Sequence, residues 1–141
     1  MKRLWLYTGV AGGSVVQFFV EQIWNSYIRP DAFYNFRPIL RDFPLLPSTF
    51  LSQLAFALVI GFLYLHVPDK KRSVKSGITI GTILGLLSGL SQYLNWYALF
   101  NIPFSLAAAE LIKMAVLGIA GGVVISFAEL RMNPRNPPSV A

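Results

Sequence analysis

Four long apolar runs, separated by short polar or proline-rich segments, restrict the fold of this chain more than any other feature. A helix needs about 20 mainly apolar residues to cross roughly 30 Å of hydrocarbon, and each run is long enough. The runs lie at about 4–27, 48–67, 75–100 and 105–131. Charged residues make up only 13% of the chain, whereas soluble domains have about a quarter. The sequence therefore predicts an all-α protein, a four-helix transmembrane bundle formed by a single domain over residues 1–132.

Prolines mark the ends of the predicted helices. A residue that precedes proline is pushed out of the helical region, so the first helix should end before Pro30 and the second before Pro68. Residues 29–47 between them contain four prolines and several aromatic side chains. Aromatic side chains suit the headgroup layer, so we expect an outer interfacial loop there. Residues 133–141 are rich in proline and should form a flexible tail.

The distribution of lysine and arginine predicts the topology. Eight of these residues flank one end of the helices, namely Lys2, Arg3, Lys70, Lys71, Arg72, Lys75, Arg131 and Arg135, and three lie in the loop at the other end, Arg29, Arg37 and Arg41. The richer side is normally cytoplasmic. We therefore expect an up-down, multi-pass protein of the cytoplasmic (inner) membrane with both termini inside. The net charge of +6 has the same explanation, so we expect the lipid bilayer, and no nucleic acid, as a partner.

Glycines stand four residues apart in the third run, at Gly77, Gly81, Gly85 and Gly89. Residues at this spacing fall on nearly one stripe of a helix. Small residues on such stripes are the usual contact surface of membrane helices. The glycine stripe therefore predicts a helix-packing interface, either within one bundle or between chains of a homo-oligomer or a larger membrane complex.

Polar side chains inside the bilayer concentrate at one level. A charged residue at a helix centre costs about 2.5 to 3.5 kcal/mol on insertion scales, so it tends to face the bundle interior and to be functional. Three ionisable residues lie well within the runs, Glu21, Glu110 and Lys113. With a rise of about 1.5 Å per residue, they lie roughly 8 to 12 Å below the outer interface. Ser52, Gln53 and Ser88 lie near the same level. We predict a polar pocket in the outer half of the bundle, with these candidate ligand- or ion-binding residues: Glu21, Glu110, Lys113, Gln17, Asn25, Gln92 and Asn95.

The charged candidates each have a structural and a functional interpretation. Glu110 and Lys113 are three residues apart and therefore neighbours on one helix face. They could form a structural ion pair, or Glu110 could bind a proton or cation with Lys113 as its counter-charge. Glu21 could accept a hydrogen bond from Gln92 or Asn95, pair with Lys113, or serve as a binding carboxylate.

Residues near the predicted interfaces have simpler expected roles. Trp5, Trp24 and Trp96 lie toward helix ends and fit an interfacial aromatic belt. His66 should be an ordinary interfacial side chain, and Glu129 should lie on the surface.

Conventional catalytic signatures are missing from the sequence. It has no Gly-x-Ser-x-Gly, His-Glu-x-x-His or Walker motif. It also has no cysteine and only one histidine, so thiolate chemistry and a multi-histidine metal centre are excluded. We expect no enzyme activity, no cofactor and no metal centre.

Three segments resemble a known group of proteins. They are Phe-Phe-Val-Glu-Gln-Ile-Trp at 18–24, Gly-Leu-Ser-Gln-Tyr-Leu-Asn-Trp-Tyr at 89–97, and a fourth run with Glu110 near its start. Together they resemble small prokaryotic four-helix integral membrane proteins of unknown function. Those proteins carry an acid after the tyrosine of the third helix, where this chain has Leu94 and Asn95. The resemblance implies a fold more than an activity.

Two function classes follow from these patterns. In the first, the outer pocket binds or translocates a proton, a cation or a small polar or amphipathic ligand. In the second, the chain is a non-catalytic accessory subunit that packs through its glycine stripe into a larger membrane complex.

Overall fold

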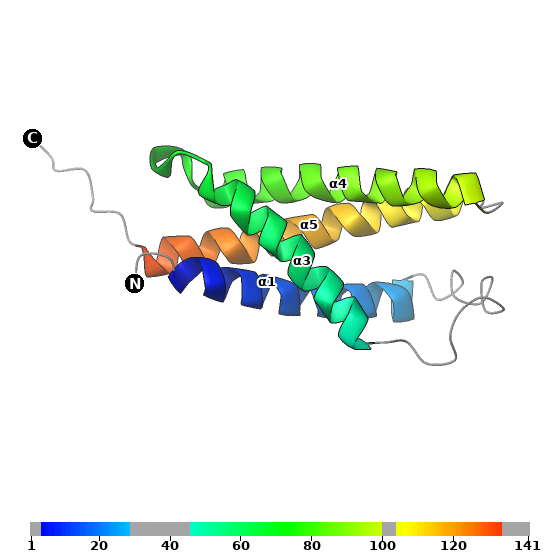
Figure 1. Cartoon of the computed structure of the whole chain (residues 1–141), viewed down its shortest axis with the longest axis horizontal. Coiled ribbons are helices and arrows are strands. Elements are labelled where there is room, and N and C mark those ends of the chain that lie inside the picture. The colour runs from blue at the N-terminus through cyan, green and yellow to red at the C-terminus, as the bar shows by residue number, and fades with distance from the viewer. Residues whose placement is uncertain (1–3, 29–45, 100–103, 134–141) are drawn as a thin grey trace, which may run out of the picture.

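The computed structural model describes residues 4–28, 46–99 and 104–133. It contains four long helices, α1 (Leu4–Ile23), α3 (Leu46–Leu65), α4 (Val74–Leu99) and α5 (Phe104–Met132) (Figure 1). A π-helical turn, η1 (Trp24–Ile28), continues α1, and a 3-10 turn, η3 (Asp69–Lys71), joins α3 to α4. All regular structure in these ranges is helical, which confirms the all-α prediction.

The helix ends differ from the predicted ones by a few residues. Helix α3 begins at Leu46 and includes Pro47, because a proline in the first helical turn lacks only an N–H that would be unpaired there. The first predicted helix ends in a π-helical turn rather than an α-helical one. Most of the predicted loop 29–47 and tail 133–141 lies outside the described residues.

Three helices are long and apolar enough to cross a membrane, over Leu46–Leu65, Val74–Asn95 and Ala108–Met132. Large apolar side chains on several helices are exposed, for example Phe19, Phe62, Leu87 and Ile112. A soluble monomer seldom shows such extensive apolar surface. Both findings indicate a membrane protein. Helix α1 is equally long as α3, but its amide and carboxylate side chains make it less apolar.

Helix α5 lies between α1 and α4, and α3 crosses the other helices obliquely (Figure 1). The start of α1 and the end of α5 lie at the same end of the bundle. We call this end, with Leu4 and Met132, the terminal end, and the opposite end, with Leu46 and Phe104, the distal end. Helices α3 and α4 are connected at the terminal end and diverge toward the distal end (Figure 1). This divergence creates the space in which the candidate site lies.

The glycine stripe of α4 packs against α5 of the same chain. A methyl group added to Gly77 would overlap the carbonyl of Gly122, and one added to Gly81 would overlap that of Gly118. At the other end of the stripe, a methyl group added to Gly89 would lie 3.1 Å from Cα of Leu111. The two helices are therefore antiparallel and in backbone contact. The stripe was predicted to pack either within one bundle or between chains. In the structure it packs within one chain, against α5.

A core of buried apolar side chains lies toward the terminal end, where α3 crosses α1. Trp5 is only 4% exposed and meets Tyr64 edge to face, with ring centroids 6.1 Å apart. The prediction of a belt residue was wrong for Trp5, because α3 covers the face of α1 that carries it. Trp24 is partly buried, and the side chain of Trp96 lies outside the described ones.

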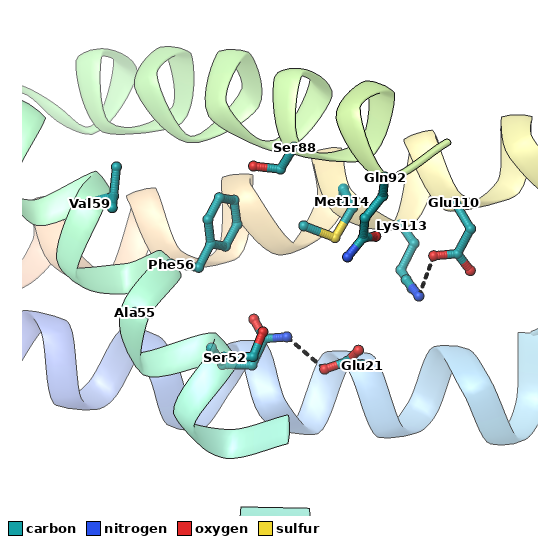
Figure 2. A pocket seen from close by; sticks show the side chains of 11 residues that line it. Glu21, Ser52, Ala55, Phe56, Val59, Ser88, Gln92, Glu110, Lys113 and Met114 are labelled. Carbon is teal, nitrogen blue, oxygen red and sulfur yellow. Dashed lines mark hydrogen bonds and ion pairs between the residues drawn. The ribbon is translucent and has the colours of Figure 1, made fainter. Parts of the chain in front are cut away.

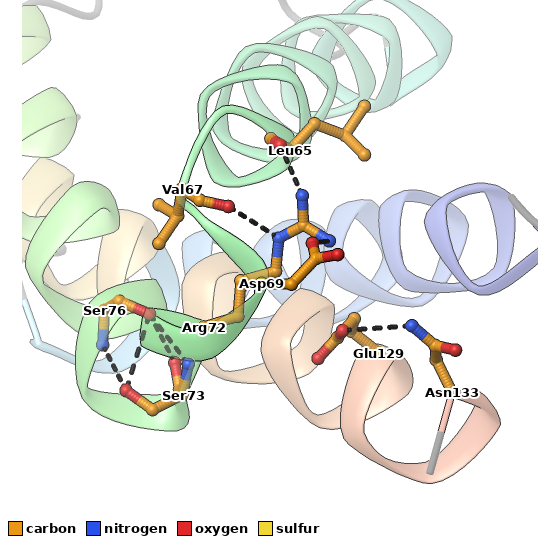
Figure 3. A network of polar contacts seen from close by, with 8 residues as sticks. All are labelled: Leu65, Val67, Asp69, Arg72, Ser73, Ser76, Glu129 and Asn133. Carbon is orange, nitrogen blue, oxygen red and sulfur yellow. Dashed lines mark hydrogen bonds and ion pairs between the residues drawn. The ribbon is translucent and has the colours of Figure 1, made fainter. Parts of the chain in front are cut away.

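Glu129 is fully buried, with 0% exposure, so the prediction of a surface residue was wrong. It lies four residues after Ile125 and eight after Gly121, on the stripe of α5 that packs against α1. Asn133 donates a hydrogen bond to its carboxylate at 3.4 Å (Figure 3).

Arg72 closes the C-terminal end of α3. Its guanidinium donates to the carbonyls of Leu65 at 2.5 Å and Val67 at 2.9 Å, and pairs with Asp69 at 2.6 Å (Figure 3). It also lies over the ring of Trp5, 5.9 Å from the centroid. The last carbonyls of a helix have no partner inside it, so a cation placed there stabilises the end of α3.

The next helix begins with a reciprocal pair of serines. The backbone N–H of Ser76 donates to the Ser73 hydroxyl at 3.2 Å, and the backbone N–H of Ser73 donates to the Ser76 hydroxyl at 2.9 Å. This arrangement has the form of a capping box. It sets the start of α4 at Val74 and with it the direction in which α4 leaves α3.

Candidate functional site

A pocket of about 440 Å³ lies between the helices in the distal half of the bundle (Figure 2). All four helices contribute to it. Its lining consists of Glu21 from α1, Ser52, Gln53, Ala55, Phe56 and Val59 from α3, Ser88 and Gln92 from α4, and Glu110, Lys113 and Met114 from α5. Four of the seven residues predicted from the sequence therefore meet at one pocket, Glu21, Gln92, Glu110 and Lys113.

An ion pair forms one wall of this pocket. The ammonium of Lys113 lies 2.5 Å from Oε2 of Glu110, and the two side chains are 10% and 13% exposed (Figure 2). The spacing of three residues puts both groups on one face of α5. The ammonium thus compensates one of the two carboxylates of the pocket.

Glu21 forms the opposite wall, and its partner comes from α3. The side-chain amide of Gln53 donates from Nε2 to Oε2 of Glu21 at 2.6 Å. The structural interpretation of Glu21 named Gln92, Asn95 or Lys113 as its partner, and the partner is instead Gln53. Helix α3 crosses α1 obliquely, so its first turns lie beside the distal end of α1 (Figure 1). The crossing angle, which no local pattern encodes, places the amide of Gln53 there.

The hydrogen bond to Glu21 also orients the rest of the Gln53 side chain. Since Nε2 is the donor in this bond, Oε1 points away from the carboxylate. Gln53 is only 4% exposed, and its Oε1 is buried with no hydrogen-bond partner among the described residues. A buried acceptor without a donor is rare in folded proteins and calls for an explanation. The lining residue Gln53 therefore has an unpaired, buried acceptor next to its bond with Glu21.

The other three predicted site residues do not line the pocket. Gln17 is fully buried and donates from Nε2 to the carbonyl of Leu117 at 2.9 Å. Gly121 makes room for it, since an added methyl group there would overlap the Gln17 amide. Gln17 thus ties α1 to α5. Asn25 lies partly buried in the π-helical turn η1, and Asn95 is exposed one turn beyond Gln92.

Of the other lining residues, the sequence marked the polar ones but not the apolar ones. Ser52, Gln53 and Ser88 stand out as polar residues in apolar runs, but nothing in the sequence indicated that Gln53 binds Glu21. The apolar lining residues, such as Phe56 and Met114, had no signal at all. In a run where nearly every residue is apolar, composition does not mark the ones that face a pocket.

Comparisons with protein-family models, with curated proteins and with solved structures found no match. The assignment of a function therefore rests on the pocket and on the chemistry of its lining.

Proposed function

We propose that this chain is an integral membrane protein whose outer pocket binds, or carries across the membrane, a proton, a cation or a small polar or amphipathic ligand. In this proposal the chain crosses the inner membrane four times in an up-down arrangement, without a catalytic step. Both termini are cytoplasmic, and the distal end of the bundle is the outer end.

The charge distribution supports this topology. The described basic residues outside the pocket all belong to the terminal end, in the turn between α3 and α4, at the start of α4 and at the end of α5. Cytoplasmic segments are normally enriched in lysine and arginine. The terminal end is therefore the better candidate for the cytoplasmic side. The fourth crossing, by α1, is supported by its length of 20 residues and by its packing alongside α5.

The charge inside the pocket is the observation that carries the proposal. Two carboxylates, Glu21 and Glu110, face one ammonium group, Lys113. With these groups ionised, the pocket has a formal charge of −1. A charge taken out of water is costly unless it is paired, and within the part of the chain that the structure describes the bonded partner of Glu21 is the neutral amide of Gln53. A cation at Glu21 would neutralise the pocket.

The alternative of an accessory subunit has less support. It depended on the glycine stripe as the surface that meets other proteins. Those glycines contact α5 of the same chain, so a partner would need another surface.

The test uses the full chain in lipid nanodiscs, with methylammonium and sodium ions as probes. A ligand that binds only the folded state stabilises it by about 2.7 kcal/mol at 100 times its Kd. We expect methylammonium, and sodium more weakly, to raise the melting temperature. Glu21→Gln should abolish this shift and preserve the fold, because an amide at position 21 can still accept the bond from Gln53. Asn95→Ala, an exposed site outside the pocket, is the matched control and should behave as the unmodified chain.

A second pair of variants separates binding from a purely structural role. If the charges serve only the fold, Glu110→Gln should cost about 3 to 5 kcal/mol by stranding Lys113. The double change Glu110→Gln with Lys113→Met should then restore stability. That rescue, together with no effect of Glu21→Gln on any cation-dependent shift, would refute the binding proposal.

A further inference from the structure

The pocket is open between α3 and α4. Ser52, Ala55, Phe56 and Val59 all line it, and their spacing places them on one face of α3. Ser52 and Ala55 are exposed, and Val59 is 48% exposed. Helix α4 diverges from α3 at this level (Figure 1). Among the described helices, none covers this face of α3, so the pocket continues into a cleft on the side of the bundle.

In a bilayer, this cleft opens toward lipid rather than toward water. Helix α3 is one of the three helices long and apolar enough to span a membrane. Val59 lies in the second half of this helix, and its neighbour Leu58 is 52% exposed. A ligand dissolved in the bilayer could therefore reach the pocket from the side.

The polarity of the cleft changes along α3. At Ser52 and Gln53 the lining is polar, and at Val59 it is apolar. Val59 lies roughly 10 Å further along the helix axis than Ser52, at about 1.5 Å per residue. On the proposed topology this direction leads toward the bilayer centre. A molecule with its polar head beside Glu21 and its hydrocarbon chain along Phe56 and Val59 would have the orientation of an outer-leaflet lipid.

The head group that fits is a positively charged hydrogen-bond donor. Glu21 has no ion-pair partner among the described residues, and Oε1 of Gln53 is a buried acceptor that likewise has no partner there. A primary ammonium group offers both the charge and three N–H donors. A quaternary ammonium offers the charge alone.

We infer that the pocket takes single-chain amphiphilic amines from the outer leaflet, through the cleft between α3 and α4. The ammonium lies against the carboxylate of Glu21, beside the amide of Gln53, and the alkyl chain runs past Phe56 and Val59 into the bilayer. This inference rests on the proposed function, because it names the ligand class of the same pocket.

The test compares three amines on the full chain in phosphatidylcholine nanodiscs, with the signal of empty nanodiscs subtracted. All three carry a positive charge. Dodecylamine also has an alkyl chain and N–H donors, dodecyltrimethylammonium has the alkyl chain but no N–H donors, and methylammonium has N–H donors but no long alkyl chain. Burial of each CH2 group raises affinity from water about fourfold, so two buried groups already give more than tenfold. We expect dodecylamine to bind at least tenfold more tightly than either comparator, and to lose this advantage in Glu21→Gln.

A variant pair tests the route of entry. Val59→Trp should fill the cleft without touching a carboxylate, and should weaken dodecylamine binding at least tenfold and methylammonium binding much less, because methylammonium has no alkyl chain to pass Val59. Leu58→Trp is the matched control, since Leu58 is similarly exposed but does not line the pocket. It should leave both affinities unchanged.

The possible failures are distinguishable. If methylammonium binds through Glu21 as tightly as dodecylamine, the ligand class is wrong and the proposed function stands. Equal affinity for dodecylamine and dodecyltrimethylammonium would overturn the donor role assigned to the head group. If the chain is a dimer that Val59→Trp dissociates, a second copy occupies the cleft and the inference falls. If no amine binds but sodium still stabilises the protein through Glu21, the ligand class is wrong and the proposed function stands. If neither amines nor sodium bind, both fall.

Discussion

Substituting alanine for Gly81 should destabilise the protein, although alanine is the better helix former. A methyl group at this position would overlap the carbonyl oxygen of Gly118 and lie 2.6 Å from its carbonyl carbon. Optimal contact between carbon atoms is about 3.5 to 4.0 Å, so the helices must separate by roughly 1 Å. Both obstructing atoms belong to the backbone and cannot rotate away. The strain is therefore shared along the whole contact between α4 and α5.

The expected loss of stability in Gly81→Ala is the balance of two opposing effects. Overpacking a close contact typically costs about 1 to 3 kcal/mol. Alanine in place of glycine gains at most about 1 kcal/mol of helix propensity. Separating the backbones also weakens the contacts at Gly77 and Gly85, so we expect Gly81→Ala to lower the free energy of unfolding by about 2 kcal/mol.

Gly13 of α1 provides the matched control. Its added methyl group would meet atoms of Gly121 and Ile125 at 3.6 to 3.7 Å, which is ordinary contact. Gly13→Ala should therefore be neutral or raise stability by up to about 1 kcal/mol. Reversible unfolding in mixed detergent micelles, followed by circular dichroism, measures both free energies. If Gly81→Ala unfolds at the same denaturing-detergent fraction as Gly13→Ala, the backbone contact between α4 and α5 does not exist as described.

Three further results are expected. Lys113→Met should lower the free energy of unfolding by about 3 to 5 kcal/mol, because it leaves Glu110 without its ion partner in a mostly buried site. Added methylammonium should recover part of this loss. If the variant is fully stable in the absence of methylammonium, a strong ion pair is excluded. Arg72→Ala should lower the free energy of unfolding by about 2 kcal/mol in the same assay, because charged hydrogen bonds to the end of α3 are lost. Arg72→Lys should lower it almost as much, since an ammonium lacks the guanidinium fork. Full stability of Arg72→Lys would show that the positive charge alone suffices. A single cysteine at Lys71 should react with an impermeant thiol reagent only from the cytoplasmic side; labelling from outside would reverse the topology.

Several features of this protein could be read from the sequence because they depend on local spacing. The four helices follow from the length of the apolar runs, and their ends from prolines and capping residues within a few positions. The pairing of Glu110 with Lys113 follows from a spacing of three residues on one helix. The glycine spacing marked a packing surface, although the sequence did not say which helix would meet it.

Other features were decided by the tertiary structure. The bond between Gln53 and Glu21 joins residues 32 positions apart and depends on the oblique crossing of α3 over α1. The same crossing buries Trp5, which the sequence placed in an interfacial belt. Gln17 was expected at the pocket but binds the backbone of α5 instead, because Gly121 leaves room for it.

The sequence does not predict these tertiary contacts because the surrounding solvent is a lipid bilayer rather than water. In water, a helix shows which face is buried by the alternation of apolar and polar residues. In a bilayer, lipid tails are as apolar as the protein core, so packing and a few polar contacts, rather than hydrophobicity, determine how helices associate. The sequence of this chain therefore determined which segments are helices and at what level their polar groups lie. Only the packing of α3 and α4 around α5 decided which of those groups share a pocket.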